Sequence, residues 1–211
     1  MRTSKLWGMG LALVASVALV GCSLGTVAPT PTVLDLGAEP TAAASKTAAT
    51  AATATTAWRF EGLVLPPFNE WRTRDRDAVI WRLGSDGVPN RYATFRWRDA
   101  PATLVRERMV QRLSMHGPIL MESINAELPQ LQVTLMQFEQ VFAADGSSNQ
   151  GVVTMQAVLV QNGKVVDQFL GTESAAGQAN DAPAGAQALR VATDRLIARL
   201  VQWLSGSLQS S

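Results

Sequence analysis

The clearest pattern in the chain is a set of three alternating segments in its second half. Residues 131–142, 151–160 and 165–172 alternate between apolar and polar positions and are rich in β-branched residues, which predicts three strands. Asn162 and Gly163 separate the second and third segments, and this pair supplies the positive φ angles of a two-residue type I′ turn. We therefore expect an antiparallel meander whose tightest turn is Asn162-Gly163.

Three further strands are predicted before the meander. Residues 58–65 form an apolar-rich run that ends at Pro66-Pro67. Residues 78–83 and 91–97 are separated by a loop-forming sequence, Gly-Ser-Asp-Gly-Val-Pro-Asn. In the last strand one set of alternate side chains is expected to face the core: Ala93, Phe95 and Trp97.

A helix is expected after the third strand. Asp99 is a suitable N-cap and Pro101 fits the first helical turn. The apolar residues that follow recur at helical spacing along one stripe: Ala102, Val105, Met109 and Leu113. Arg106 lies at the margin of this stripe, where we expect its stem to pack while its guanidinium reaches water, with an acidic partner as the alternative.

A second and longer helix is predicted from about residue 184 to residue 204. Its apolar side carries Leu189, Ala192, Leu196, Leu200 and Trp203. The charged residues lie away from that side: Arg190, Asp194, Arg195 and Arg199. Packing against the sheet is the simplest interpretation, and a membrane-surface helix or a coiled coil is the alternative.

These elements predict an α+β domain over residues 58–205. The expected sheet is mostly antiparallel, with about five to six strands, and two main helices pack on it in the order β-β-β-α-β-β-β-α. Residues 206–211 are expected to form a flexible tail. Residues 22–57 are rich in Ala, Thr and Pro and have the composition of a flexible tether, although residues 32–36 alternate weakly and are also compatible with an edge strand. A helix is less favoured for the Ala/Thr tract, because β-branched Thr is frequent there.

Residues 1–21 have the pattern of a secretory signal peptide. Arg2 and Lys5 precede an apolar run over residues 6–19. That length fits a signal peptide and is too short for a membrane-spanning helix, which needs about 20 apolar residues. We therefore expect this segment to be removed by cleavage.

The sequence Leu19-Val20-Gly21-Cys22 resembles a lipobox. Small residues precede a cysteine whose sulfur accepts a diacylglyceryl group, so we expect signal peptidase to recognise Leu19, Val20 and Gly21 and the lipid to attach to Cys22. A buried cysteine in an uncleaved signal anchor is the alternative. Ser23 stands where enterobacterial lipoproteins retained in the inner membrane have aspartate. That analogy favours the periplasmic face of the outer membrane.

Composition agrees with an exported, lipid-anchored protein. Of 211 residues, 47% are hydrophobic and 17% charged, which fits one globular domain plus chain that need not fold. Loss of Arg2 and Lys5 leaves 16 basic and 17 acidic residues, so charge does not suggest a nucleic-acid partner. Cys22 is the single cysteine, so no intramolecular disulfide forms and stability must come from packing.

Candidate catalytic chemistry is sparse. His116 is the only histidine, and it precedes Gly117-Pro118, where we expect a loop. No Ser-His-Asp set, metal-ligand cluster or glycine-rich phosphate loop can be assembled from the sequence. The sequence therefore predicts a protein that is not an enzyme and has no cofactor and no metal.

A local excess of arginine gives the one candidate binding surface. Residues 72–112 contain ten arginines and five acidic residues. Arg72, Arg74 and Arg76 occupy alternate positions and would present one basic edge to lipid phosphates or an acidic partner; solvated strand and loop faces are the plainer explanation. The nearby Phe68 and Trp71 fit either an interface or the core.

Taken in order, these features resemble the auxiliary lipoprotein component of ABC-type transport systems, the family of paraquat-inducible protein C. The resemblance covers essentially all of the mature chain. It rests on four details after the lipobox: Leu34-Asp35-Leu36, Pro66-Pro67-Phe68, Tyr92 with Arg96-Trp97 before the first helix, and Trp203-Leu204 near the end of the last. The Ala/Thr tract before Trp58 is an insertion relative to the family pattern.

The resemblance implies a non-enzymatic part of an intermembrane lipid transport system. Its implied partners are an ABC permease, its ATPase and a mammalian-cell-entry (MCE) domain protein, with the membrane bound through Cys22. A homo-oligomeric ring is expected, because a tube-like partner favours cyclic symmetry. A lipoprotein activator of a peptidoglycan synthase and a structural envelope lipoprotein are the alternatives.

Overall fold

The structure is a computed structural model that describes residues 30–37, 58–70, 76–122 and 127–209. One compact unit extends from Pro31 to the C-terminus. The predicted signal peptide, Cys22 and the Ala/Thr tract at 38–57 lie outside the described residues.

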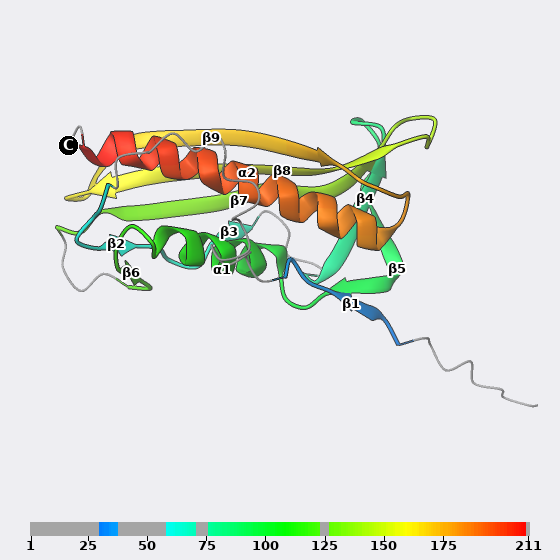
Figure 1. Cartoon of the computed structure of the whole chain (residues 1–211), viewed down its shortest axis with the longest axis horizontal. Helices are drawn as coiled ribbons and strands as arrows, with labels where there is room; N and C mark the ends of the chain where they lie inside the picture. Colours follow the sequence, from blue (N-terminus) through cyan, green and yellow to red (C-terminus); the bar gives the residue numbers. More distant parts are fainter. Residues whose placement is uncertain (1–29, 38–57, 71–75, 123–126, 210–211) are drawn as a thin grey trace, which may run out of the picture. The chain divides into compact units, whose positions relative to one another are not determined.

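The meander predicted in the second half of the chain is confirmed. Three strands of 13 residues each, β7 (Gln130–Phe142), β8 (Asn149–Gln161) and β9 (Lys164–Ala176), pair antiparallel in sequence order. Asn162 has φ 50° and Gly163 φ 70°, as the predicted two-residue turn requires. These strands are the longest in Figure 1.

The rest of the sheet joins the other edge of β7. There β4 (Ala78–Leu83) runs parallel to β7 and forms an antiparallel hairpin with β5 (Asn90–Trp97). Four short strands complete the sheet: β1 (Thr32–Leu34), β2 (Leu63–Val64), β3 (Asn69–Glu70) and β6 (Ile119–Leu120).

The prediction of a mostly antiparallel sheet is wrong. Among the described strands five pairings are parallel and three antiparallel, so the nine-stranded sheet is mixed. Strands β4 and β7 run parallel because the connection between them is long and contains both β5 and the first helix, which together return the chain to the side of the sheet from which β4 starts.

The predicted element order also needs correction. Strands β3 and β6 have two residues each, too few to produce a periodic pattern, and β1 lies in the segment 32–36 that the sequence left open as an edge strand. Of the predicted strand at 58–65 only Leu63–Val64 is a strand. This part of the chain bonds to the residues that follow the first helix. There Phe60 N–H donates to His116 O at 3.1 Å and Leu63 N–H to Pro118 O at 3.0 Å.

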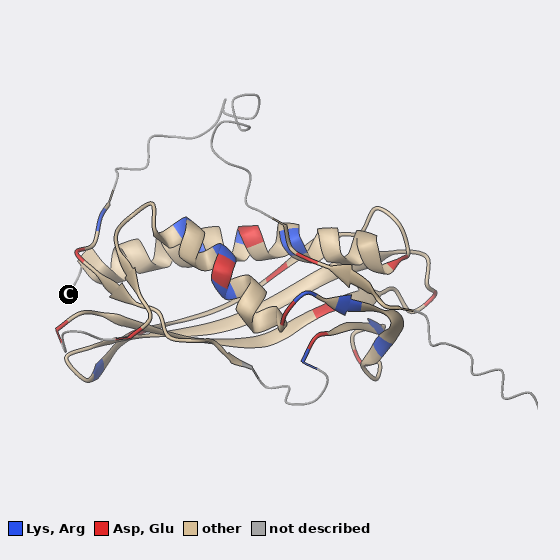
Figure 2. Cartoon of the chain, turned by 90° about the horizontal axis from the view of Figure 1, so that it is seen from below, with Lys and Arg blue, Asp and Glu red and all other residues tan. Residues whose placement is uncertain are grey.

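Two helices, α1 (Pro101–Leu113) and α2 (Ala182–Gln209), lie on the same face of the sheet (Figures 1 and 2). Pro101 opens α1 as predicted, but the N-cap is Ala100. Asp99 instead accepts a hydrogen bond from the N–H of Ala100 at 2.6 Å. Since α2 continues to Gln209, residues 206–209 are helical and do not belong to a flexible tail.

The core lies between the helices and the sheet, and both predicted apolar stripes point into it. Of the five residues of the predicted α2 stripe only Trp203 is half-buried and the others are buried, so the stripe packs on the sheet as predicted. The β5 prediction holds for Trp97 and for Phe95, which is half-buried and packs against the core, whereas Ala93 is exposed. Fully buried side chains from both layers make up the centre: Val105, Met109, Leu113, Leu131, Val153, Met155, Leu159, Leu189, Leu196 and Leu200.

Candidate functional site

The segment just after the predicted lipobox is built into the domain. Strand β1 pairs parallel with β5, with Thr32 opposite Phe95 and Leu34 opposite Trp97. The N–H of Arg98 donates to Leu34 O at 2.8 Å, which continues the pairing. Leu36 follows with 1% of its surface exposed and joins the main core. Residues 32–36 are therefore an edge strand and a core contact, which resolves the alternative left open by the sequence.

A buried arginine holds the end of this segment. Arg108 of α1 is 2% exposed, and its Nη1 donates to Leu36 O at 3.1 Å and to Gly37 O at 2.7 Å. Its Nε and Nη2 donate to the carboxylate of Asp194 on α2, at 2.6–2.8 Å. Every nitrogen of the guanidinium thus has a partner, as a buried cation requires. We call Leu36, Gly37, Arg108 and Asp194 the N-terminal docking site.

An exposed pair of ionic contacts lies beside the N-terminal docking site. Arg98 bonds to Glu107 at 2.6 Å and to Asp35 at 3.1 Å. The hydrogen bond to Glu107, followed by the one to Asp35, raises the pKa of Arg98 above its ordinary value. Because all three side chains are well exposed, these contacts add little to stability and mainly orient the segment.

Only some of the candidate site residues predicted from the sequence lie in the described part of the chain. Leu19, Val20, Gly21 and Cys22 lie outside the described residues, as do three members of the predicted arginine surface, Trp71, Arg72 and Arg74. Of the remaining two, Phe68 is half-buried and packs against the core, and Arg76 is exposed. The predicted basic edge therefore stays a prediction.

The guanidinium of Arg106 binds backbone carbonyls and not the acidic partner that was the alternative. Its Nη2 donates to Leu65 O at 2.6 Å and its Nε to Pro66 O at 3.1 Å, and it also contacts the sulfur of Met121. Burial lowers the pKa of Arg106. This arginine closes the end of β2, where the Pro66-Pro67-Phe68 sequence begins.

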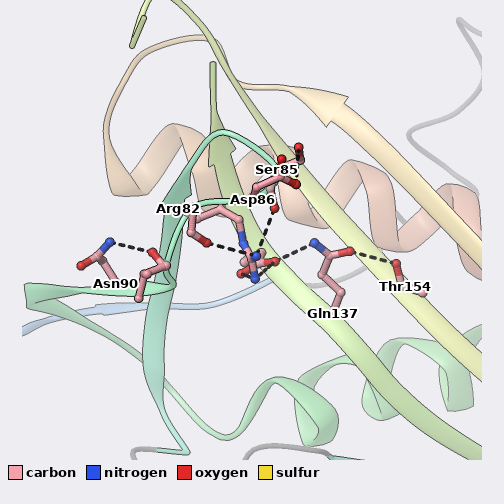
Figure 3. Close-up of polar contacts among 9 residues, drawn as sticks. Arg82, Ser85, Asp86, Asn90, Gln137 and Thr154 are labelled. Carbon is pink, nitrogen blue, oxygen red and sulfur yellow. Dashed lines mark hydrogen bonds and ion pairs between the residues drawn. The ribbon is translucent and has the colours of Figure 1, made fainter. Parts of the chain in front are cut away.

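A second polar cluster extends across the sheet (Figure 3). Arg82 of β4 pairs with the buried Glu139 of β7 at 2.7 Å and also reaches the carbonyl of Ser85 at 3.3 Å. Gln137 donates to the same carboxylate at 2.6 Å and accepts from Thr154 of β8 at 3.2 Å. The Arg82 Nε is buried and has no partner among the described residues. The cluster fixes the β4–β5 hairpin against the long strands.

An uncharged network ties the start of α2 to three strands. Tyr92 of β5 donates to Gln140 Oε1 at 2.8 Å, and Gln140 Nε2 donates to Asn149 Oδ1 at 2.8 Å and to Asp181 O at 3.1 Å. The Asp181 side chain accepts from Ala184 N–H at 2.8 Å and caps the helix. Burial, and then the charge of Asp181, raises the pKa of Tyr92 to about 12, so its hydroxyl remains a donor at neutral pH.

Other candidate chemistry is limited in the described part of the chain. His116 is half-buried and stacks on Trp58 with ring centroids 4.7 Å apart. Within the described ranges no three His, Cys, Asp or Glu side chains come together as metal ligands, and no helix is long and apolar enough to span a membrane. An open cavity of about 560 Å³ at the end of the β7–β8 hairpin is lined by uncharged residues, among them Phe142 and Asn149.

The free edge of the sheet is partly covered by arginines. In β9, Thr172 O accepts from Arg199 at 3.2 Å and Ser174 O accepts from Arg195 at 3.0 Å. Near the start of β9 the carboxylate of Asp167 accepts three hydrogen bonds, from Ser207 at 2.5 Å, from Gln168 N–H at 2.8 Å and from Trp203 at 2.8 Å. These bonds lower the pKa of Asp167, and the bond from Ser207 is the largest cause. Unpaired carbonyls at a sheet edge can pair with a strand of another molecule, so the bonds from Arg195 and Arg199 protect this edge.

Removal of the two covering arginines is expected to promote self-association. The double variant Arg195→Ala/Arg199→Ala exposes two edge carbonyls, and we expect a larger mean mass than the parent at equal concentration in sedimentation velocity. The control Arg59→Ala/Arg76→Ala removes the same charge from exposed positions outside β9. Equal masses for the double variant and its control would refute the protective role.

Comparison with known proteins supplies a fold and no family. No protein-family model and no curated protein matches the chain. Among solved structures, a Xanthomonas campestris protein of the DUF330 family is similar at TM-score 0.63 and 19% identity, over 74% of this chain and 91% of its own. An uncharacterised protein is similar at TM-score 0.60 and 12% identity, over 83% and 99%.

A third solved structure extends the likeness. A hypothetical protein from Chlamydia trachomatis is similar at TM-score 0.50 and 9% identity, over 72% of this chain and 99% of its own. Each of these proteins is matched along nearly its full length, so the shared region is their whole fold. At such identities the likeness concerns architecture alone: this chain has the α+β fold of the DUF330 protein.

Proposed function

We propose that this chain is a lipoprotein of the bacterial cell envelope, anchored through Cys22 to the periplasmic face of the outer membrane. In this proposal it is a non-enzymatic auxiliary component of an ABC-type MCE system for intermembrane lipid transport. Its partners are the MCE-domain protein and, through it, the permease and ATPase. Several copies form a ring around the conduit.

The observation that carries the proposal is the order of sequence features from the lipobox to Trp203-Leu204. In the folded chain the first of these features, Leu34-Asp35-Leu36, pairs with β5 and enters the core. The second, Pro66-Pro67-Phe68, is held by Arg106, and the last lies on the helix that covers β8 and β9. The features that prompted the family resemblance are thus structural parts of one domain.

In this role the domain works through the place at which it is held on the membrane. Acyl chains on Cys22 hold it at the membrane, with several chains needed because a single one binds only weakly. Since β1, Leu36 and Arg108 join the anchored segment to the core, force on the anchor passes directly to the folded domain. The ATPase supplies the energy elsewhere in the assembly.

Two measurements test the proposal. The first is the intact mass of membrane-extracted protein, which should carry acyl mass that Cys22→Ala loses together with sedimentation in the membrane fraction. The second is crosslinking in cells followed by mass spectrometry, which should recover an MCE-domain protein. Recovery of a peptidoglycan synthase would favour the activator alternative, and absent acyl mass would reject the anchor.

A further inference from the structure

The Ala/Thr tract is bounded at both ends by residues packed in the domain. Before it, Leu36 is buried and Arg108 binds the carbonyls of Leu36 and Gly37. After it, Trp58 is 7% exposed, stacks on His116 and lies with its carbonyl oxygen 3.3 Å from His116 Nδ1. The twenty residues 38–57 therefore begin and end on the same folded body.

From this arrangement we infer that residues 38–57 add nothing to the reach of the membrane anchor. The linker between Cys22 and the folded domain is then the nine residues from Ser23 to Pro31, which we call the lead. The end of the domain where β1 starts is the end held at the bilayer. The inference rests on the proposed lipidation of Cys22.

The difference in reach is large. Nine residues span at most about 30 Å when fully extended, whereas a tether running from Cys22 to Trp58 would span about 120 Å. A chain of that longer kind would let the domain search for a distant partner. The short lead holds the first residue of β1 close to the lipid surface, so a partner must approach the membrane to meet the domain.

The same arrangement gives the domain one end near the membrane and one end far from it. In Figures 1 and 2 the chain enters β1 at one end of the long strands, and the C-terminus of α2 lies at the other. The far end also carries the Asn162-Gly163 turn between β8 and β9. Strands of 13 residues are about 43 Å long, which separates the two ends by more than the lead itself. Position along the strands thus reports distance from the membrane.

Matched insertions test the inference in full-length lipidated protein. One variant carries a ten-residue Gly/Ser insertion after Val27, inside the lead, and its control carries the same insertion after Ala48, inside the Ala/Thr tract. Each is combined with Thr94→Cys, near the β1 end, or Lys164→Cys, at the far end, for labelling with a fluorescent donor. The protein is reconstituted in phosphatidylethanolamine/phosphatidylglycerol vesicles that contain an acceptor-labelled lipid.

We expect the uninserted protein to transfer more energy from position 94 than from position 164. The insertion after Val27 roughly doubles the lead and should lower transfer from position 94 about twofold. The insertion after Ala48 should leave transfer at the parent value. Equal losses from the two insertions would overturn the inference, as would equal transfer from the two positions. Acyl mass on Cys22 is measured in the same samples, and its absence would instead reject the proposed function.

Discussion

Replacing Arg108 with alanine is expected to lower the free energy of unfolding by about 3 kcal/mol, the lower end of the range for breaking a buried ion pair. The lower end applies because the partner, Asp194, retains 35% exposure of its side chain and can recover some hydration. The change also leaves the carbonyls of Leu36 and Gly37 without their donor. Denaturation by urea, followed by Trp fluorescence, measures the loss.

The matched control is Arg195→Ala, on an exposed position of α2. Arg195 makes one bond, to the carbonyl of Ser174, so we expect a loss below about 1 kcal/mol. A second readout separates docking from general stability. Amide hydrogen exchange at Leu34 and Leu36 should accelerate in Arg108→Ala more than at β8. If Arg108→Ala and Arg195→Ala cost the same, Arg108 is not the residue that holds the N-terminal segment.

The same site shows where sequence reasoning stops. The apolar stripe of α1 was predictable because it repeats at helical spacing, and four of its members are buried. Arg108 stands beside Met109 in that stripe, and an arginine there has no periodic signal of its own. Its partner Asp194 lies 86 residues away on the other helix, and was placed on the side of α2 away from the apolar stripe. Only the packing of α1 against α2 reveals the pair.

The direction in which the strands pair could also not be predicted from local sequence patterns. The meander is fixed by alternation and by Asn162-Gly163, both of which are local, so it was predicted closely. The parallel pairing of β4 with β7 depends on the path of α1 across the sheet, which no short sequence window encodes. The two-residue strands β2, β3 and β6 likewise exist because β7 or a neighbour offers them an edge.

For the candidate site, sequence and structure contribute different parts. Leu19-Val20-Gly21-Cys22 is predicted from its pattern alone and lies outside the described residues. The N-terminal docking site could not be found that way, because it joins residues that follow β1 with residues of α1 and α2. Because Leu36 before the Ala/Thr tract and Trp58 after it are both packed in the domain, the tract is a segment between two fixed points and not a tether. If Cys22 is lipidated as proposed, the linker to the membrane is shorter than the composition of residues 22–57 suggests.

The second large effect is expected at Gly151, where β8 passes beneath α2. An added Cβ would lie 2.7 Å from the carbonyl carbon of Ala188 and 2.8 Å from Cα of Leu189. Both atoms belong to the helix backbone, so the clash cannot be relieved by turning a side chain. We expect Gly151→Ala to lower the free energy of unfolding by about 2 kcal/mol, within the usual range for overpacking a core. Urea denaturation measures this loss as well.

A second glycine gives the matched control. Gly206 lies within α2, and a Cβ there would meet nothing within 4 Å. Alanine favours a helix interior over glycine by about 1 kcal/mol, so Gly206→Ala should leave stability unchanged or raise it. The two substitutions thus add the same methyl group with opposite expected signs. A loss at Gly206 equal to that at Gly151 would show that close approach of α2 to β8 is not the cause. The predicted contrast therefore tests whether the position of α2 over the meander depends on the absence of a side chain at Gly151. The same helix supplies Asp194, the partner of Arg108 in the N-terminal docking site.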